Sequence, residues 1–293
     1  MPSLKEVKGR IVSVTSTQQI TKAMKMVAAA KLRRSQERIM QLRPFAQKLN
    51  FLLQNLSSSD NEKENWYNTV REEKKILIVS ISADRGLSGA FNSNIFKTTQ
   101  RLINEKYSEQ AKKGNVTILP IGRKANDYFA KRTYKVVDQY WNLFQGLSFA
   151  KAAVIAEYLM DVFQKGQYDK IEIVYNEFKN VATQILRTEQ FLPVPPAEKK
   201  EESTSAVDYI YEPSRDEIMT GLIPKSLKIQ LYKAVLDSDA AFNGAQMTAM
   251  DKATENAGEL LKELKLTYNR TRQAAITKEI LEIVAGAEAL KSA

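Results

Sequence analysis

The apolar residues in the last third of the chain recur at intervals of three and four positions from Pro224 to Leu290. This spacing is typical of a coiled-coil seam that drifts in phase. A helix of about 65 residues, at about 1.5 Å per residue, would be about 100 Å long and therefore wider than a compact domain. Pro224 suits a first helical turn, so the helix is predicted to begin there. The predicted seam residues are Leu227, Leu231, Ala234, Val235, Met247, Met250, Ala253, Ala257, Leu260, Leu261, Leu264, Ile276, Ile280, Ile283, Ala287 and Leu290.

A second run of helical periodicity occupies the N-terminal end of the chain. Its apolar seam is Leu4, Val7, Ile11, Val14, then Ala28, Leu32, Ile39, Leu42, Ala46, Leu49 and Leu53. The seam positions between the two parts are Gln18, Thr21 and Lys25. We interpret this polar break as a face that is poor for a partner helix. Polar residues from Ser57 to Asn61 predict that the helix then gives way to a linker.

Between the two long helices, apolar runs typical of strands alternate with helical patterns. This alternation predicts a small α/β domain with a largely parallel sheet. The polar, proline-rich stretch that begins at Phe191 predicts a mobile loop, assigned to 193–206. The predicted strands are 76–81, 116–121, 171–175, 183–187 and 209–211, and the predicted helices are 91–107, 123–131 and 149–164.

The predicted fold class is therefore α/β, with a long antiparallel two-helix coiled coil formed by the N- and C-terminal helices and an inserted Rossmann-like α/β domain. The N-terminal coiled-coil helix is assigned to 1–58 and the linker to 59–73. The α/β domain is assigned to 74–212 and the C-terminal coiled-coil helix to 213–293. The two long helices must run antiparallel if they pair, because both join the domain at their inner ends.

The last turns of the chain are apolar or very small on almost every side of the helix. A helix that is hydrophobic all round must be enclosed. Counting outward from the domain brings Leu4 level with about Ile276, so the first helix is too short to enclose the turns beyond that level. Another chain is expected to do so, and the alternative is that the terminal turns pack into the chain's own core. The small residues of this stretch are Ala285, Gly286, Ala287 and Ala289.

Composition excludes several kinds of chemistry. The chain has no cysteine and no histidine, which excludes disulfides, Cys or His metal sites and imidazole catalysis. No apolar run approaches the roughly 20 residues that span a bilayer, so membrane association is expected to be peripheral. No signal or transit segment is recognised before the first helix. We predict no catalytic residues, no metal and no cofactor.

The net charge of +10 is concentrated near the N-terminus. From Met1 to Arg43 there are ten Lys or Arg and two Glu. Such a face suits an acidic protein surface, an anionic lipid or nucleic acid, or it is simply solvated. The strongest alternative function is thus a coiled-coil adaptor that binds nucleic acid through its basic first helix. Against it, no aromatic residue that could stack on bases precedes Phe45.

The segment from Asp84 to Asn92 follows a strand and precedes a helix, where α/β folds place phosphate sites. It contains Gly86 and Gly89, but neither a third glycine nor a Gly-Lys-Ser/Thr sequence. Both the dinucleotide and the P-loop patterns are therefore incomplete. A tight structural turn is the favoured interpretation, and a nucleotide-dependent enzyme is the disfavoured one.

Several runs of the sequence resemble the gamma subunits of F-type ATP synthases. The longest run is Ile276–Ala289, ITKEILEIVAGAEA, which is similar to the C-terminal signature of that family. Leu4–Arg10 and Ile20–Ala29 resemble the opening helix of the family. Met250–Ala257 and Tyr268–Ala274 also match, and Asp84–Asn92 resembles its first loop.

The resemblance implies a non-catalytic rotor shaft of the central stalk. Such a shaft turns inside a hexamer of alternating alpha and beta subunits and couples proton or sodium flow through the membrane ring to ATP synthesis at beta. It also implies contacts of the α/β domain with the epsilon subunit and the c-ring, no nucleic acid partner, and a peripheral position on the cytoplasmic side of the cell inner membrane. The partner-binding residues that it implies are Lys22, Met24, Lys25, Met26, Asn269, Arg270, Arg272, Gln273, Ile276, Glu279, Ile280, Ile283, Val284 and Ala287.

Overall fold

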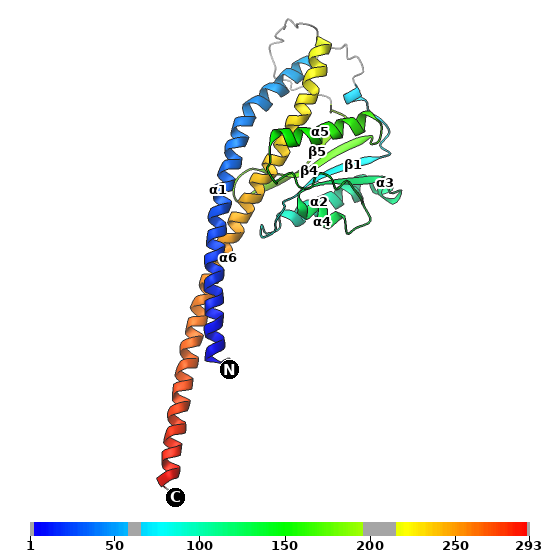
Figure 1. Cartoon of the computed structure of the whole chain (residues 1–293). Coiled ribbons are helices and arrows are strands. Elements are labelled where there is room, and N and C mark those ends of the chain that lie inside the picture. The colour runs from blue at the N-terminus through cyan, green and yellow to red at the C-terminus, as the bar shows by residue number, and fades with distance from the viewer. Residues whose placement is uncertain (1–2, 58–65, 196–214, 292–293) are drawn as a thin grey trace. The chain divides into compact units, whose positions relative to one another are not determined.

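The computed structural model describes residues 3–57, 66–195 and 215–291 (Figure 1). The predicted strand at 209–211 and most of the predicted loop at 193–206 lie outside these residues. The chain divides into two units. One is made of Met1–Ala28 with Met247–Ala293, and the other of Ala29–Gln246.

Both long helices are present. Helix α1 spans Leu4–Ser57 and helix α6 spans Arg215–Lys291. The prediction that the second helix begins at Pro224 is wrong, because Pro224 lies inside α6. A proline inside a helix removes one hydrogen bond and crowds the preceding turn. The neighbouring side chains of Ile223 and Leu227 are buried in the core of the second unit, and this packing holds the helix through the proline.

In the first unit, α1 and α6 pair in antiparallel orientation. The Thr21 hydroxyl lies 2.8 Å from that of Thr254, and Lys25 Nζ lies 2.5 Å from Asp251 Oδ1. As the residue number rises along α1, it falls along α6. Apolar seam positions on both helices are buried in this unit, namely Val7, Ala28, Met250 and Ala257.

The second unit contains a five-stranded sheet with the order β3-β2-β1-β4-β5. All neighbouring pairs are parallel except β4 and β5, which are antiparallel. The strands are β1 (Ile76–Ile81), β2 (Val116–Ile121), β3 (Lys135–Val136), β4 (Lys170–Phe178) and β5 (Gln184–Leu192). The helices that connect them are α2 (Phe91–Lys106), α3 (Ser108–Lys112), α4 (Arg123–Phe129) and α5 (Phe149–Gln164).

Helices cover both faces of the sheet. Alternate residues of β1 point to opposite faces, so Leu77 and Val79 pack in one cluster and Ile76 and Ile78 in the other. The first cluster includes side chains of α5 and α6, and the second includes side chains of α2 and α4. The predicted α/β fold, with a domain inserted between two long antiparallel helices, is confirmed.

The first part of α6 packs on the sheet rather than along a coiled-coil seam. The prediction placed Leu227, Leu231, Ala234 and Val235 in that seam, but all four lie in the sheet cluster with α5. The side chains that α1 contacts on α6 in this unit include Leu236 and Ala240, which meet Leu32 and Ile39 of α1. Periodicity identified the buried face correctly but could not show which element covers it.

Several short or edge elements were not predicted. A 3-10 turn, Trp66–Asn68, lies in the stretch assigned to the linker, and its Tyr67 is buried in the core. Helix α3 and strand β3 were also missed. Strand β5 continues to Leu192, so the predicted strand end at residue 187 is five residues too early, and Phe191, the first residue of the proline-rich stretch, belongs to the strand. Phe191 and Leu192 are fully buried, which explains why the strand extends to them.

Candidate partner-binding surface

The C-terminal end of α6 has no cover from the described part of the chain. By the register of Thr21 with Thr254, Leu4 lies level with roughly Thr271. Figure 1 shows α6 continuing past the N-terminal end of α1. Every side chain from Ile276 to Glu288 is exposed. We call Ile276–Glu288 the apolar tip. The alternative that these turns pack into the chain's own core is wrong for the described residues.

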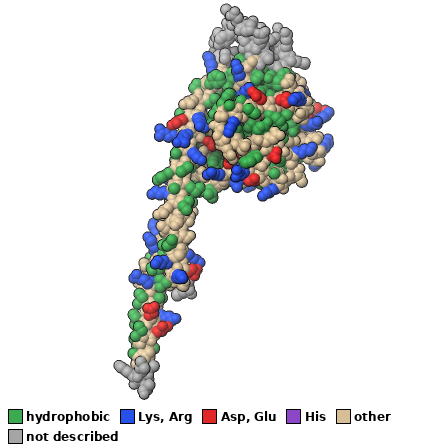
Figure 2. Space-filling model, viewed as in Figure 1, with side chains coloured by type: hydrophobic (Ala, Val, Ile, Leu, Met, Phe, Trp, Pro, Cys, Tyr) green, Lys and Arg blue, Asp and Glu red, His purple; other side chains and the backbone are tan. Residues whose placement is uncertain are grey.

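The apolar tip exposes a continuous set of large aliphatic side chains. Ile280 is 55% exposed and Ile283 is 71% exposed, and Leu281 is exposed with them. Figure 2 shows hydrophobic side chains along this end of α6, with charged side chains between them. Scattered single hydrophobic residues are common on protein surfaces, but a continuous exposed patch marks an interaction surface. The predicted site residues here, all exposed, are Ile276, Glu279, Ile280, Ile283, Val284 and Ala287.

The apolar tip also contains a glycine and charged side chains. An ideal Cβ built on Gly286 would meet no atom within 4 Å, so nothing in the described structure requires a glycine there. Lys278 and Glu282 form an exposed ion pair of 3.6 Å one helical turn apart. Such a pair adds little to helix stability, so the tip depends on its helical propensity and on any partner.

The predicted residues on α1 divide into free and paired positions. Lys22 is exposed, Met26 is 63% exposed, and Met24 is half-buried. Lys25 instead forms an ion pair with Asp251 of α6. The Lys25 ammonium is therefore engaged within the chain, although the pair stays partly exposed.

The interpretation of the polar break on α1 is wrong. Gln18, Thr21 and Lys25 face α6, where Thr21 is only 8% exposed and the Gln18 amide donates to the Thr254 carbonyl at 3.4 Å. The two helices therefore pair through polar groups at this point. A polar side chain can occupy a heptad position when the partner helix offers it a hydrogen bond or an opposite charge. Thr254 does so for Thr21, and Asp251 does so for Lys25.

The predicted residues of α6 lie at a different level from those of α1. Asn269, Arg270, Arg272 and Gln273 are all exposed, and they follow Thr254 by about 22 to 28 Å along the helix axis. Among the described residues, neither Arg270 nor Arg272 forms an ion pair. The structure therefore presents two separate polar groups of side chains rather than one cluster.

Five apolar residues of α1 that are more than half exposed were not predicted as site residues, namely Val12, Ile20, Val27, Met40 and Phe45. They lie outside the heptad of the first helix, whose positions include Val7, Ile11 and Val14. An apolar residue off the seam of an otherwise polar helix was the signal that would have identified them.

Side chains of the turn from Asp84 to Asn92 form hydrogen bonds with backbone groups in and beside the turn. The Asn92 side chain accepts from Ala83 N at 3.0 Å and donates to the Arg85 carbonyl at 3.1 Å, and Asp84 accepts from Arg123 N at 2.9 Å. Ala241 of α6 packs against Ala83 and Phe91 beside it. Helix α6 therefore fills part of the sheet edge where α/β folds bind ligands, as expected for a structural turn.

Comparison with known proteins identifies the family. A model of the ATP synthase family matches residues 3–290. The ATP synthase gamma chain of Cytophaga hutchinsonii is 58% identical over 295 residues, with 100% of both chains covered. That of Flavobacterium johnsoniae is 55% identical over 291 residues, with 99% of each covered. The chain belongs to the ATP synthase gamma chain family.

Solved structures agree with this gamma-chain assignment. A chain in the central stalk and c-ring structure of the Tetrahymena thermophila mitochondrial ATP synthase is 25% identical, with a TM-score of 0.55 over 80% of this chain and 99% of that one. A chain of the Euglena gracilis mitochondrial ATP synthase has a TM-score of 0.70 at 23% identity, over 98% of this chain and 94% of that one. The second likeness shows the fold alone.

None of the described helices combines the length and the hydropathy needed to cross a bilayer. No group of three or more acidic side chains in the described residues is arranged to hold a metal ion.

Proposed function

We propose that this chain is the rotating central-stalk subunit that couples ion flow through a membrane ring to ATP synthesis at beta subunits, without catalytic residues of its own. The observation that carries the proposal is the apolar tip, which nothing in the described chain covers. The Tetrahymena relative comes from a central stalk and c-ring, and a Euglena structure with a TM-score of 0.64 is titled as a rotor.

The hexamer of alpha and beta subunits is proposed to surround the apolar tip. Ile280 and Ile283 would lose their exposure to water there, which stabilises the complex by about 25 cal/mol per Å² of apolar area. A static plug would favour large aromatic anchors. The small side chains of Ala285 and Ala287 instead give shallow contacts, which keep barriers to turning low.

The polar groups are proposed to engage the beta subunits. On α6 these are Arg270, Arg272, Asn269 and Gln273, and on α1 they are Lys22 and Lys25 with Met24 and Met26. Free guanidinium groups can form bidentate contacts with carboxylates, so an acidic segment of beta suits them. A surface that binds one conformation of beta better than another shifts its population, and this is how the shaft would open and close catalytic sites in turn.

The α/β domain is proposed to contact the epsilon subunit and the c-ring. The whole complex would then hold the chain peripherally at the cytoplasmic face of the cell inner membrane. No membrane-spanning helix of its own is needed for that position.

Reconstitution with alpha and beta subunits tests the proposal. The full chain should yield a complex that hydrolyses ATP, whereas the chain alone should not hydrolyse it. Substituting Ile276, Ile280 and Ile283 with Asp should lower the yield of complex by at least about tenfold, since three buried aliphatic contacts are lost. The circular dichroism of the free variant should match that of the parent, because all three side chains are exposed.

Val70→Asp is the matched control, because Val70 is 82% exposed but lies in the other unit. It should leave assembly unchanged. Equal loss of assembly in both variants would show that the apolar tip is not the contact with the hexamer of alpha and beta subunits. RNA binding by the parent, without capture of alpha and beta, would favour the nucleic acid adaptor instead.

A further inference from the structure

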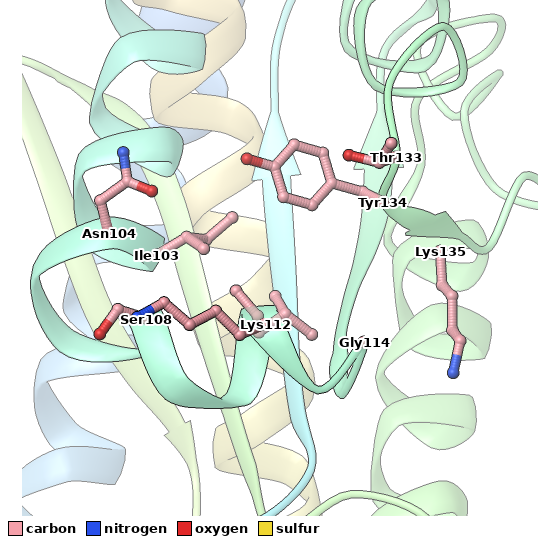
Figure 3. Close-up of a pocket in the computed structure, with 10 residues that line it drawn as sticks. Ile103, Asn104, Ser108, Lys112, Gly114, Thr133, Tyr134 and Lys135 are labelled. Carbon is pink, nitrogen blue, oxygen red and sulfur yellow. The ribbon is translucent and has the colours of Figure 1, made fainter.

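A cavity of about 390 Å³ lies in the α/β domain, at the end of the sheet opposite the turn that follows β1. Its walls come from the C-terminal half of α2, from α3, and from the residues that lead into β3 (Figure 3). A volume of this size is typical of small-molecule sites. None of the residues implied by the family resemblance lines it. The lining residues are Ile103, Asn104, Ser108, Ala111, Lys112, Gly114, Val116, Thr133, Tyr134 and Lys135.

The floor of this cavity is apolar and its rim is polar. Ile103 and Val116 are almost fully buried and form part of the core cluster between the sheet, α2 and α4. Tyr134 packs its ring edge-on against Phe129, with the ring centroids 6.0 Å apart, so the ring is held in place. Figure 3 shows the Tyr134 hydroxyl and the Asn104 side chain directed toward each other across the opening.

The charge of the lining is positive. It contains Lys112 and Lys135 but no acidic residue. Neither ammonium forms an ion pair among the described residues, although elsewhere in this domain Lys106, Lys165 and Lys170 are paired with carboxylates. Figure 3 shows Lys112 extended along α3 toward Ser108, whereas the Lys135 side chain leaves β3 in a direction away from Tyr134. Both have long stems that can move a charged head toward a ligand.

These features restrict the chemistry of a ligand. A cation would meet a lining that carries lysines and no carboxylate, and a purely apolar molecule would leave the polar rim without partners. An anion with an apolar, flat body satisfies both parts, since its charge can pair with Lys112 and its body lies on Ile103, Val116 and the Tyr134 ring. We propose that this cavity binds a small organic anion of about the size of a nucleoside monophosphate.

The site is separate from the proposed rotor function. It lies within the second unit and uses none of the residues assigned to alpha or beta contacts. A ligand bound there would bridge α2 and α3, which only Tyr107 separates, to β3, which follows β2 and α4 in the chain. Binding would therefore stabilise this edge of the domain.

Titration of the full-length chain with AMP, followed by the methyl resonances of its isoleucines, tests the proposal. The Ile103 methyl signal, assigned through Ile103→Val, should shift with saturation, while that of Ile173 on the far cluster should not. Lys112→Glu should weaken AMP binding by at least about tenfold, because a charge-assisted contact becomes a repulsion. Lys113→Glu makes the same change in net charge one residue away, outside the lining, and should leave binding unchanged.

Adenosine and inorganic phosphate test the apolar body and the charge of the proposed ligand separately. Adenosine and inorganic phosphate should each bind more weakly than AMP, because each offers only one half of the required chemistry. No shift of Ile103 at millimolar AMP, or an equal effect of Lys112→Glu and Lys113→Glu, would overturn the site. Equal binding of inorganic phosphate and AMP would overturn the assignment of an organic body.

Discussion

The Thr21 hydroxyl of α1 lies 2.8 Å from the Thr254 hydroxyl of α6, in the middle of the paired part of the two helices. The Thr254 hydroxyl lies 2.7 Å from the Met250 carbonyl of its own helix, and the Thr21 hydroxyl lies 3.1 Å from the Gln18 carbonyl. Each hydroxyl has one proton to donate, so when Thr254 donates to Met250, Thr21 donates to Thr254 rather than to Gln18. This chain of hydroxyls, at a seam position, fixes one register of α1 against α6.

The losses of the two hydroxyls should be coupled in their effect on stability. Thr21→Val is expected to cost about 1 kcal/mol of unfolding free energy, the usual net value of a hydrogen bond. The double variant with Thr254→Val should cost less than the sum of the single changes, because either single change already removes the bond between the two hydroxyls. Denaturant unfolding followed by circular dichroism measures all three values.

Thr267→Val is the control for this cycle. The Thr267 hydroxyl donates only to the Glu263 carbonyl of its own helix and is exposed. Its loss should change stability by no more than about 0.5 kcal/mol. Additive effects of Thr21→Val and Thr254→Val would show that the two hydroxyls do not interact.

The ion pair between Lys25 and Asp251 is expected to contribute little to the stability of the free chain. Both side chains are more than a third exposed, so water and salt screen the interaction. Lys25→Met keeps most of the stem and should change the unfolding free energy by less than about 1 kcal/mol. If Lys25 engages beta as proposed, the same variant should weaken assembly more than it weakens folding. A large loss of stability with normal assembly would assign Lys25 a purely structural role.

Gly122 is required by two independent features at the end of β2. Its φ is +99°, and an ideal Cβ would lie 2.1 Å from the Ser82 carbonyl oxygen. Gly122→Ala must therefore move the backbone of β1 or β2, and we expect a loss of about 3 kcal/mol or more. Gly86→Ala in the neighbouring turn is the control, since no atom lies within 4 Å of its Cβ position. Thermal unfolding of the two variants gives the comparison, and equal melting temperatures would contradict the clash.

The long helices and the buried strands were predictable because their patterns are local. Strands Ile76–Ile81 and Val116–Ile121 and helix Phe149–Gln164 have the predicted bounds, since each is an apolar run of one period between clear breaks. The exposure of Ile276–Glu288 was also predictable, by counting residues along two helices of unequal length. These inferences need only periodicity and rise per residue.

The partner that satisfies a given side chain could not be predicted from local patterns. Leu231 and Val235 match the spacing of a seam, and only the fold shows that the sheet covers them. Thr21 and Lys25 interrupt an apolar pattern, and their partners Thr254 and Asp251 are more than 220 residues away in sequence. Strand β3 has two residues, too few for any period, and exists because β2 offers it a neighbour.

Asp237 gives the domain a specific pH dependence. This residue of α6 is 2% exposed, and burial raises the pKa of its carboxyl from 3.8 to about 6. The nearby charges are mixed, with Lys233 and Arg43 lowering the pKa and Glu177 and Glu189 raising it. Burial of the charged form is therefore only partly compensated.

Because the folded state holds this proton more tightly than the unfolded chain, the carboxyl costs nothing below about pH 4 and destabilises the fold as the pH rises toward 6. A rise of about two pKa units corresponds to about 3 kcal/mol of unfolding free energy, and the folded state loses this full amount above pH 6. Asp237→Asn should remove the penalty, so that the variant is more stable than the parent at pH 7 and the gain vanishes near pH 4. Denaturant unfolding of both proteins across this range measures the difference, which cancels the other titrating groups. A difference between Asp237→Asn and the parent that stays constant across this range would show that Asp237 is ionised throughout it and stabilised by Lys233 and Arg43.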